Sequence, residues 1–145
     1  MKVKDILAKK PPGVISISPD RTLLDASKLL SEHNIGVLIV VDANQLPVGI
    51  LSERDIIRLL AQHGAVVLER SVSSAMTEGI IIANPDDNLA TLSNSMTENR
   101  FRHVPIMDGD SLVGIVSIGD IVKAQLRYFE GEARALQTYI TGGRA

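Results

Sequence analysis

A short motif that could bind a sugar-phosphate ligand occurs twice in the chain. Its copies run from Gly49 to Asp55 (GILSERD) and from Gly114 to Asp120 (GIVSIGD), each between an apolar run and a stretch with helical periodicity. The serine can cap such a helix, and the aspartate three residues later falls in its first turn. Because aspartate is shorter than the usual glutamate partner, its carboxylate can point outward instead of folding back. It could then accept hydrogen bonds from two ribose hydroxyls, while nearby free N–H groups donate to a phosphate.

The same residues also have a purely structural interpretation. Ser52 with Asp55, and Ser117 with Asp120, could be capping boxes that only hold the ends of two helices. Their occurrence at matched positions of a duplicated pattern favours a binding role. The two interpretations are compatible, because a capping serine can also face a ligand.

Composition and charge exclude several classes of protein. The net charge is −2 and aromatic residues make up 3% of the chain, which argues against a nucleic-acid binder. The absence of cysteine excludes disulfides and thiolate metal sites. Neither a signal peptide nor an apolar run of about 18 residues is evident, so we expect a cytoplasmic protein without a membrane span.

Most of the chain consists of two copies of one unit. The segment around Pro19 recurs 66 residues later, whereas Gly49 and Gly114 are 65 residues apart, because one turn of the second copy is a residue shorter. A weaker echo links residues 3–7 with residues 72–76. Such an internal duplication has to be recognised before a fold is predicted.

Each unit is expected to fold as β-α-β-β-α. In the first, apolar spacing and turn residues predict strands at 14–17, 37–41 and 47–51, and helices at 22–33 and 53–63. In the second they predict strands at 79–83, 104–107 and 112–116, and helices at 88–99 and 118–127. A further amphipathic helix is predicted at 130–140, ended by Gly142 and Gly143.

A small sheet with its helices leaves one apolar face that needs a cover, and the other copy is the simplest one. We therefore predict an α+β fold in which two β-α-β-β-α repeats pair by pseudo-twofold symmetry, followed by a C-terminal helix. The first repeat is placed at residues 1–70, the second at 71–128, and the C-terminal helical extension at 129–145.

This arrangement resembles a tandem pair of cystathionine β-synthase (CBS) domains, known as a Bateman module. The resemblance covers nearly the whole chain and rests on the element order, the duplicated motif and the segment NRFRHVPI at residues 99–106. It implies binding of an adenine nucleotide (AMP, ADP or ATP, sometimes NAD or S-adenosylmethionine) in the cleft between the repeats, and dimerisation into a flat disc. Many such modules regulate enzymes, channels or transporters. No catalytic domain is attached here, so the chain resembles the stand-alone members.

The resemblance also implies roles for individual residues. Those that would hold the ribose hydroxyls are Ser52, Asp55, Ser117 and Asp120. Those that would meet phosphate are Arg54, Arg100, Arg102 and His103. Those that would contact the adenine are Ile15, Ser16, Ile17, Val37, Ile80, Ile81, Ile82 and Val104. Because Gly119 stands in place of Arg54, and Gly36 in place of Arg102, we do not expect the two sites to bind the same ligand equally.

We therefore predict a non-enzymatic regulatory module that senses an adenine nucleotide, with AMP as the first candidate and ADP, ATP or NAD(H) as alternatives. It would form a homodimer and signal to a partner protein, without binding nucleic acid or membrane. The alternative is a ligand-independent interaction or dimerisation module, suggested by the apolar stripe at Leu136 and Ile140. No P-loop, dinucleotide fingerprint or nucleophile elbow is present. The three histidines lack metal-ligand spacing.

Overall fold

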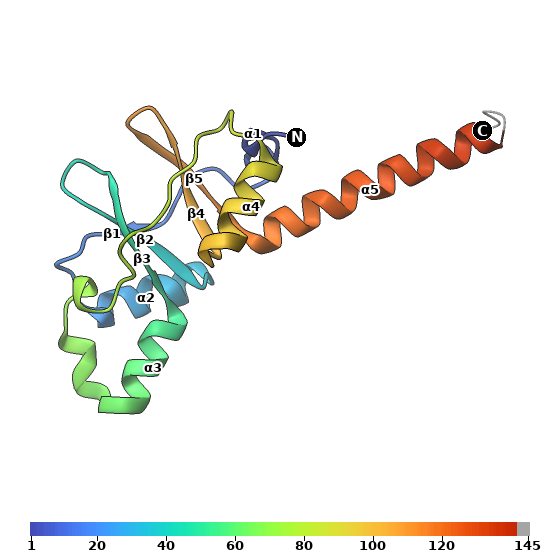
Figure 1. Cartoon of the computed structure of the whole chain (residues 1–145). Helices are drawn as coiled ribbons and strands as arrows, with labels where there is room; N and C mark the ends of the chain where they lie inside the picture. Colours follow the sequence, from blue (N-terminus) through green and yellow to red (C-terminus); the bar gives the residue numbers. More distant parts are fainter. Residues whose placement is uncertain (142–145) are drawn as a thin grey trace.

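The computed structural model describes residues 1–141, and its body contains two small sheets from which one long helix projects (Figure 1). The first sheet has the strand order β1-β2-β3. In it β1 (Ser16–Ile17) runs parallel to β2 (Val37–Val41), which is antiparallel to β3 (Pro47–Ser52). The second sheet is the antiparallel pair β4 (His103–Asp108) and β5 (Ser111–Ser117). The first repeat has the predicted β-α-β-β-α order, and the second has the same order without its first strand.

The helices begin and end at residues that the sequence marks for these roles. Thr22 caps the second helix through its side chain, and Asn34 ends it in the left-handed conformation. Asn88 caps the helix at the matching place of the second repeat. In chain order the helices are α1 (Val3–Leu7), α2 (Leu23–His33), α3 (Glu53–His63), the 3₁₀ turns η1 (Ala65–Glu69) and η2 (Val72–Ser74), α4 (Leu89–Asn99) and α5 (Ile118–Ile140).

The strand predicted at residues 79–83 does not form. Only a single parallel bridge joins Ala83 to Ile106, at the position where β1 pairs Ile17 with Val40 in the first repeat. The β1 strand itself is shorter than predicted. In both repeats the apolar segment before this pairing point crosses from one repeat to the other. It therefore has no neighbouring strand with which to form a ladder, despite its β-branched residues.

The two helices predicted at 118–127 and 130–140 are a single helix, α5. The intervening residues include no proline, and Gly131 lies within the helix, exposed and without a neighbour within 4 Å of an added Cβ. One exposed glycine costs a helix only about 1 kcal/mol, which does not end it. The predicted end at Gly142 and Gly143 lies outside the described residues.

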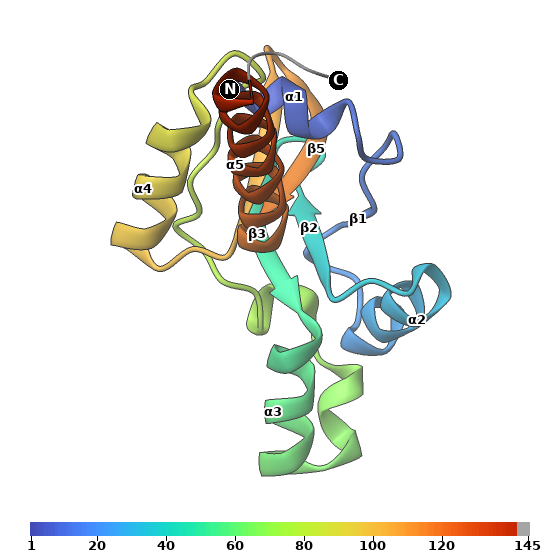
Figure 2. The same ribbon diagram turned by 90° about the vertical axis from the view of Figure 1, so that its right-hand side faces the viewer.

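The repeats exchange their entry segments. The backbone N–H groups of Val3 and Lys4 donate to the carbonyls of Asp87 (3.0 Å) and Pro85 (2.8 Å), so α1 belongs to the second repeat. Figure 2 shows α1 beside β5 and α5. Conversely, the N–H of Val72 in η2 donates to the carbonyl of Arg21 (2.7 Å) in the first repeat. The weak echo between residues 3–7 and 72–76 is thus a structural equivalence.

A glycine accommodates each of these entry segments. A Cβ added to Gly114 would lie 2.5 Å from Leu7 Cδ2, and one added to Gly49 would lie 2.7 Å from Met76 Sδ. The sequence predicts a close backbone approach at both glycines, to a ligand or to the other copy. In the structure the approach is to the other copy: Gly114 meets Leu7 at the end of α1, and Gly49 meets Met76 just after η2.

Two hydrophobic cores result, one in each repeat. The core of the first repeat includes Val72 from η2, and the core of the second includes Val3 and Ile6 from α1. Neither core contains a buried polar or charged residue within the described part of the chain. Among residues 1–141, none of the helices combines the length and hydropathy required to cross a bilayer.

Candidate functional site

Both copies of the Ser-x-x-Asp motif form capping boxes. The N–H of Asp55 donates to Ser52 Oγ (3.2 Å), while Asp55 Oδ2 accepts from the Ser52 N–H and hydroxyl, each at 2.9 Å. The N–H of Asp120 donates to Ser117 Oγ (3.0 Å), and Asp120 Oδ2 accepts from the Ser117 N–H (2.9 Å). In both copies the Oδ2 atom of the aspartate therefore folds back onto the serine, and the outward orientation suggested by the sequence is wrong for this atom. The turn brings the serine N–H within reach of even the short aspartate side chain.

The first residue of each helix is also fixed by a backbone hydrogen bond. The N–H of Ile118 donates to the carbonyl of Arg102 (2.9 Å), and that of Glu53 donates to the carbonyl of Gly36 (2.9 Å). Two first-turn N–H groups in each helix are therefore already used, which leaves fewer donors for an anion than the sequence suggested. These bonds hold Gly36 and Arg102, the residues just before β2 and β4, close to the capping boxes.

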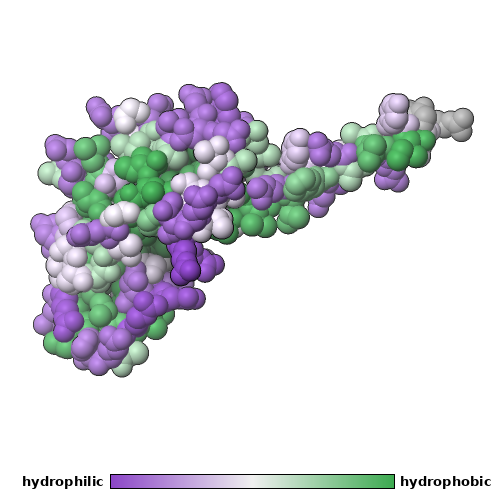
Figure 3. Space-filling view, in the orientation of Figure 1, coloured by the Kyte–Doolittle hydropathy of each residue, from purple (hydrophilic) through white to green (hydrophobic). Residues whose placement is uncertain are grey.

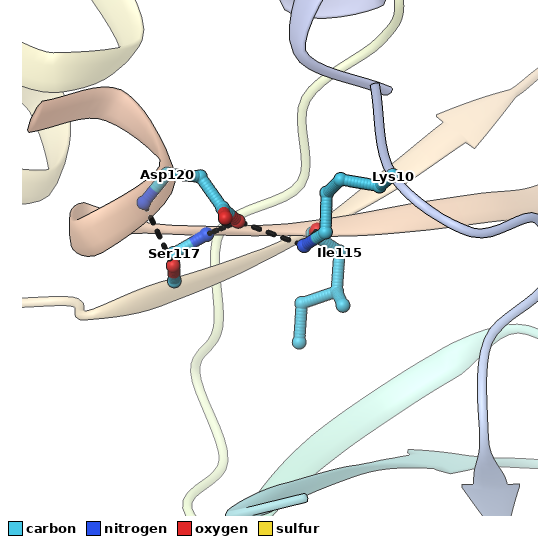
Figure 4. A network of polar contacts seen from close by, with 4 residues as sticks. All are labelled: Lys10, Ile115, Ser117 and Asp120. Carbon is cyan, nitrogen blue, oxygen red and sulfur yellow. Dashed lines mark hydrogen bonds and ion pairs between the residues drawn. The ribbon is translucent and has the colours of Figure 1, made fainter. Parts of the chain in front are cut away.

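Asp120 has an additional partner that the sequence did not indicate. The ammonium group of Lys10 lies 2.7 Å from Asp120 Oδ2 and 2.7 Å from the backbone oxygen of Ile115 (Figure 4). Lys10 comes from the loop after α1, so this contact joins the start of the chain to the second repeat. The side chains of Lys10 and Asp120 are 31% and 22% exposed, so water screens the pair only in part.

The Lys10 contact favours the ionised form of Asp120. Partial burial alone would raise the pKa of this carboxyl, but the hydrogen bonds from Lys10 and from the Ser117 backbone outweigh it and lower the pKa. Asp120 is therefore ionised at neutral pH. An ionised carboxylate at a helix N-terminus accepts hydrogen bonds from hydroxyl groups and is favoured by the helix dipole.

His103 belongs to the same electrostatic neighbourhood. Burial lowers the pKa of its imidazole, the positive charge of Arg102 lowers it further, and the nearby Asp120 carboxylate opposes the change. Of the other cations predicted to meet phosphate, Arg54 is exposed on α3, and Arg100 is exposed at the left-handed residue that ends α4. The structure thus brings His103 and Arg102 toward Asp120, and leaves Arg100 at the end of a different helix.

Asp120 opens onto a cavity of about 700 Å³ between the α1 region and the first turns of α5. This volume is typical of small-molecule sites. The cavity carries four cationic side chains and two carboxylates. Its lining residues are Met1, Asp5, Ile6, Ala8, Lys9, Lys10, Pro11, Asp120, Lys123, Ala124, Arg127 and Tyr128. Of the residues predicted for the site, only Asp120 lines it.

The adenine-binding candidates lie elsewhere, and several have their side chains in the cores. Ile17 and Val104 are buried in the cores of the first and second repeats, and Ile15 and Ile81 pack against them. Ile82 is 50% exposed on the second crossing segment. Ile80, Ser16 and Val37 are partly buried.

Sequence reasoning missed Lys9, Lys10, Lys123 and Arg127 as residues of the cavity. The available signal was weak, because two adjacent lysines before Pro11 resemble any solvated turn. Recognising them required the knowledge that α1 packs on the second repeat. No cluster of three or more metal-ligating side chains occurs among residues 1–141.

Comparison with known proteins agrees with this architecture. The family described as CBS domain matches residues 3–62 and again residues 72–127. A mitochondrial CBS domain-containing protein of Arabidopsis thaliana, CBSX3, is 36% identical over 128 residues, covering 86% of this chain and 62% of that protein. The CBS domain-containing protein YhcV of Bacillus subtilis is 33% identical over 124 residues, covering 86% of this chain and 85% of that protein. The chain thus spans somewhat less than two thirds of the first of these relatives.

Solved structures give the same result. The CBS-domain protein ATU1752 of Agrobacterium tumefaciens superimposes with a TM-score of 0.78 at 40% identity, covering 86% of this chain and 99% of that one. The CBS domain pair of MJ0100, in complex with 5′-methylthioadenosine and S-adenosyl-L-methionine, gives 0.72 at 33% identity, covering 91% and 98%. CBSX2 in complex with AMP gives 0.70 at 28% identity, covering 88% and 97%. With both repeats matched in sequence and in fold, the chain belongs to the CBS-domain family and contains a tandem pair of CBS domains.

Proposed function

We propose that this chain is a regulatory module that binds an adenosine-containing ligand beside Asp120, with AMP as the first candidate. The main support is the position of Asp120, an ionised carboxylate at a helix N-terminus that opens onto a cavity of about 700 Å³. Two structural relatives contain AMP or the adenosine compounds 5′-methylthioadenosine and S-adenosyl-L-methionine. Their shared adenosine group matches the ribose-binding role predicted for the motif.

In this proposal Asp120 accepts hydrogen bonds from the ribose hydroxyls, and the cations of the cavity meet the negative charge of the ligand. The cavity lies between α5 and the segment that follows α1. A ligand held there contacts both the N-terminal segment and the second repeat. It would therefore stabilise one relative arrangement of the two and so change the surface presented to a partner protein.

Calorimetric titration tests the proposal, with AMP, ATP and NAD(H) as the ligands. The wild-type protein should bind at least AMP, and Asp120→Asn should weaken that binding by roughly tenfold or more, because a charge-assisted hydrogen bond contributes about 1.5–3 kcal/mol. Asp55→Asn reports on the first repeat in the same way. Asp110→Asn, in the exposed hairpin turn, is the matched control and should change nothing. The absence of heat with every nucleotide on the wild-type protein would refute the proposal.

A second candidate function, self-association through α5, is supported by one specific feature. Apolar residues follow a heptad spacing along this helix, and all but Ala133 are large and more than 45% exposed. They are Val122, Leu126, Phe129, Ala133, Leu136 and Ile140. Figure 3 shows apolar surface along the projecting part of α5. We call this set the α5 seam.

A second copy of α5, aligned in parallel, fits the α5 seam. In that register the flanking positions bring Gln125 opposite Glu130 and Glu132 opposite Gln137 of the second copy, so no like charges meet. In an antiparallel arrangement Glu132 would face Glu132 of the second copy, so that like charges meet. The seam is therefore compatible with a parallel two-stranded coiled coil, which would bury side chains that are exposed in the single chain.

Solution mass distinguishes this candidate from a monomer. Leu136→Asp places a charge in the α5 seam and should convert a dimer into a monomer, whereas Thr138→Asp, on the opposite face, should leave the mass unchanged. Truncation after Arg127 should act as Leu136→Asp does. Spin labels at position 138, outside the seam, should lie closer together in a parallel pair than in an antiparallel one. A dimer that survives both Leu136→Asp and truncation would exclude the seam.

A further inference from the structure

Lys10 occupies the carboxylate that the proposed ligand would use. Its ammonium donates to Asp120 Oδ2 and to the carbonyl of Ile115, both at 2.7 Å (Figure 4). The two residues of the ion pair are 110 positions apart in the chain. Oδ2 also accepts the capping bond from the Ser117 N–H. A ribose hydroxyl that approaches this oxygen therefore meets a carboxylate that already has a cation and a backbone donor.

In the first repeat a backbone N–H, and not a cation, donates to the carbonyl that corresponds to that of Ile115. Ile50 holds the place of Ile115 in the motif, and its carbonyl accepts the backbone N–H of Thr77 (2.8 Å). Lys10 thus supplies from a side chain what Thr77 supplies from the backbone. A side-chain ammonium on a flexible stem can leave a carbonyl and return to it, whereas a backbone donor in a bridge cannot move without moving the chain.

The surroundings of Lys10 are cationic. Lys9, Lys123 and Arg127 line the same cavity, and Asp5 is the only lining carboxylate there besides Asp120. An ammonium displaced from Asp120 therefore enters a region with an excess of positive charge. A ligand with a phosphate group supplies a new counterion for it. A neutral ligand leaves the ammonium without a partner, and a cationic sulfonium ligand adds to the repulsion.

We propose that Lys10 is a displaceable counterion that makes the Asp120 site select phosphate-bearing adenosine ligands over neutral or cationic ones. This inference rests on the proposed function, since it concerns the same site. In the free protein Lys10 neutralises Asp120. In the complex the ribose hydroxyls take over the carboxylate and the ammonium turns to the phosphate. After the exchange the carboxylate is hydrogen-bonded by the hydroxyls and the ammonium is paired with the phosphate, so the ammonium has a counterion in both states only if the ligand carries an anion.

Paired titrations with AMP and adenosine test the selectivity. Lys10→Met removes the ammonium but keeps most of the apolar stem. It should weaken AMP binding and leave adenosine binding equal or tighter, so that the ratio of the two affinities falls by at least about tenfold. Lys10→Arg keeps the charge and should retain the preference for AMP. Lys28→Met, exposed on α2, is the matched control and should leave both affinities unchanged.

A second measurement, made on a Lys10→Met protein whose NMR spectrum shows that it is folded, does not depend on binding strength. In Lys10→Met the pKa of Asp120, followed by carboxyl NMR, should rise, because the lysine hydrogen bond no longer opposes the effect of burial. An unchanged affinity ratio in a folded Lys10→Met protein that still binds AMP would overturn the inference and leave the proposed function intact. A wild-type protein that binds neither AMP nor adenosine would overturn both.

Discussion

The two repeats have the same scaffold and different chemistry at the site. In both capping boxes the aspartate N–H donates to the serine hydroxyl oxygen, and aspartate Oδ2 accepts from the serine N–H. The first N–H of each of these helices, α3 and α5, donates to the carbonyl of the residue before β2 or β4. The difference lies in the entry segments. Lys10 stands three residues after Leu7, which packs on Gly114, whereas Gly79 stands three residues after Met76, which packs on Gly49. By the same alignment, Lys9 in the first entry segment corresponds to Glu78 in the second.

This comparison shows which part of a duplicated unit is free to diverge. The capping boxes keep the same serine and aspartate in both copies, whereas the entry segments, which cross to the other repeat, carry different residues just after the part that packs there. Lys9-Lys10 in one entry segment corresponds to Glu78-Gly79 in the other, so the two segments carry opposite charge. The Asp55 and Asp120 sites therefore differ in charge, and we expect a phosphate-bearing ligand to prefer the second repeat.

The largest expected effect concerns the exchange of the entry segments. Ile6 is 5% exposed in the core of the second repeat, although it lies in the sequence of the first. Ile6→Ala should cost about 2–5 kcal/mol and accelerate native-state hydrogen exchange in α4 and in the β4–β5 pair. Val72→Ala, in the opposite entry segment, should instead accelerate exchange in α2. Equal acceleration of α2 and α4 in both variants would contradict the exchange of segments.

Sequence patterns predicted the local elements well, because each depends on neighbouring residues. The duplicated motif with its capping boxes, the end of α2 at Asn34, and the hairpins all follow from such signals. They could not predict the partner of Lys10, because that contact depends on which repeat α1 covers. The predicted break in α5 failed for the opposite reason. The helix was predicted to end near Arg127, but no residue there ends a helix, and the apolar spacing continues through Phe129.

A smaller effect is expected when the two motif glycines, Gly49 and Gly114, are each replaced by alanine, and the two variants should differ in stability. A Cβ at Gly49 would meet Met76 Sδ at 2.7 Å and also the backbone oxygen of Thr77 at 3.0 Å. A Cβ at Gly114 would meet only the side chain of Leu7, at 2.5 Å from its terminal carbon. Leu7 can change rotamer, whereas the Thr77 carbonyl is fixed by its bridge to Ile50.

Gly49→Ala should therefore destabilise the protein by about 1–3 kcal/mol, as overpacking of a core usually does. Gly114→Ala should change the stability by less than about 1 kcal/mol, because the rotamer change is partly offset by the lower entropy of the unfolded chain. Chemical denaturation of the two variants in parallel measures the difference. If Gly114→Ala proved the more damaging of the pair, Leu7 would be held more rigidly than its packing suggests.

The smallest expected effect is a pH dependence confined to the second repeat. Burial and then Arg102 hold the pKa of His103 below its ordinary value of 6.5. Above that pH the imidazole is neutral in the folded and unfolded states and contributes nothing to the pH dependence. As the pH falls through 6.5 the unfolded state takes up a proton first, so stability declines until the pH is below the folded-state pKa. The first repeat has Val37 at this position and cannot respond.

Two charge variants separate the causes of the lowered pKa of His103, read from the imidazole proton by NMR. Arg102→Gln removes a positive neighbour and should raise the pKa toward 6.5, whereas Asp120→Asn removes the negative one and should lower it further. Because a bound phosphate would also favour the imidazolium, AMP should raise the pKa of His103 in the wild-type protein and bind more tightly as the pH falls toward that value. If the pKa of His103 were the same with and without bound AMP, the phosphate would lie away from β4 and would contact only the lysines of the cavity.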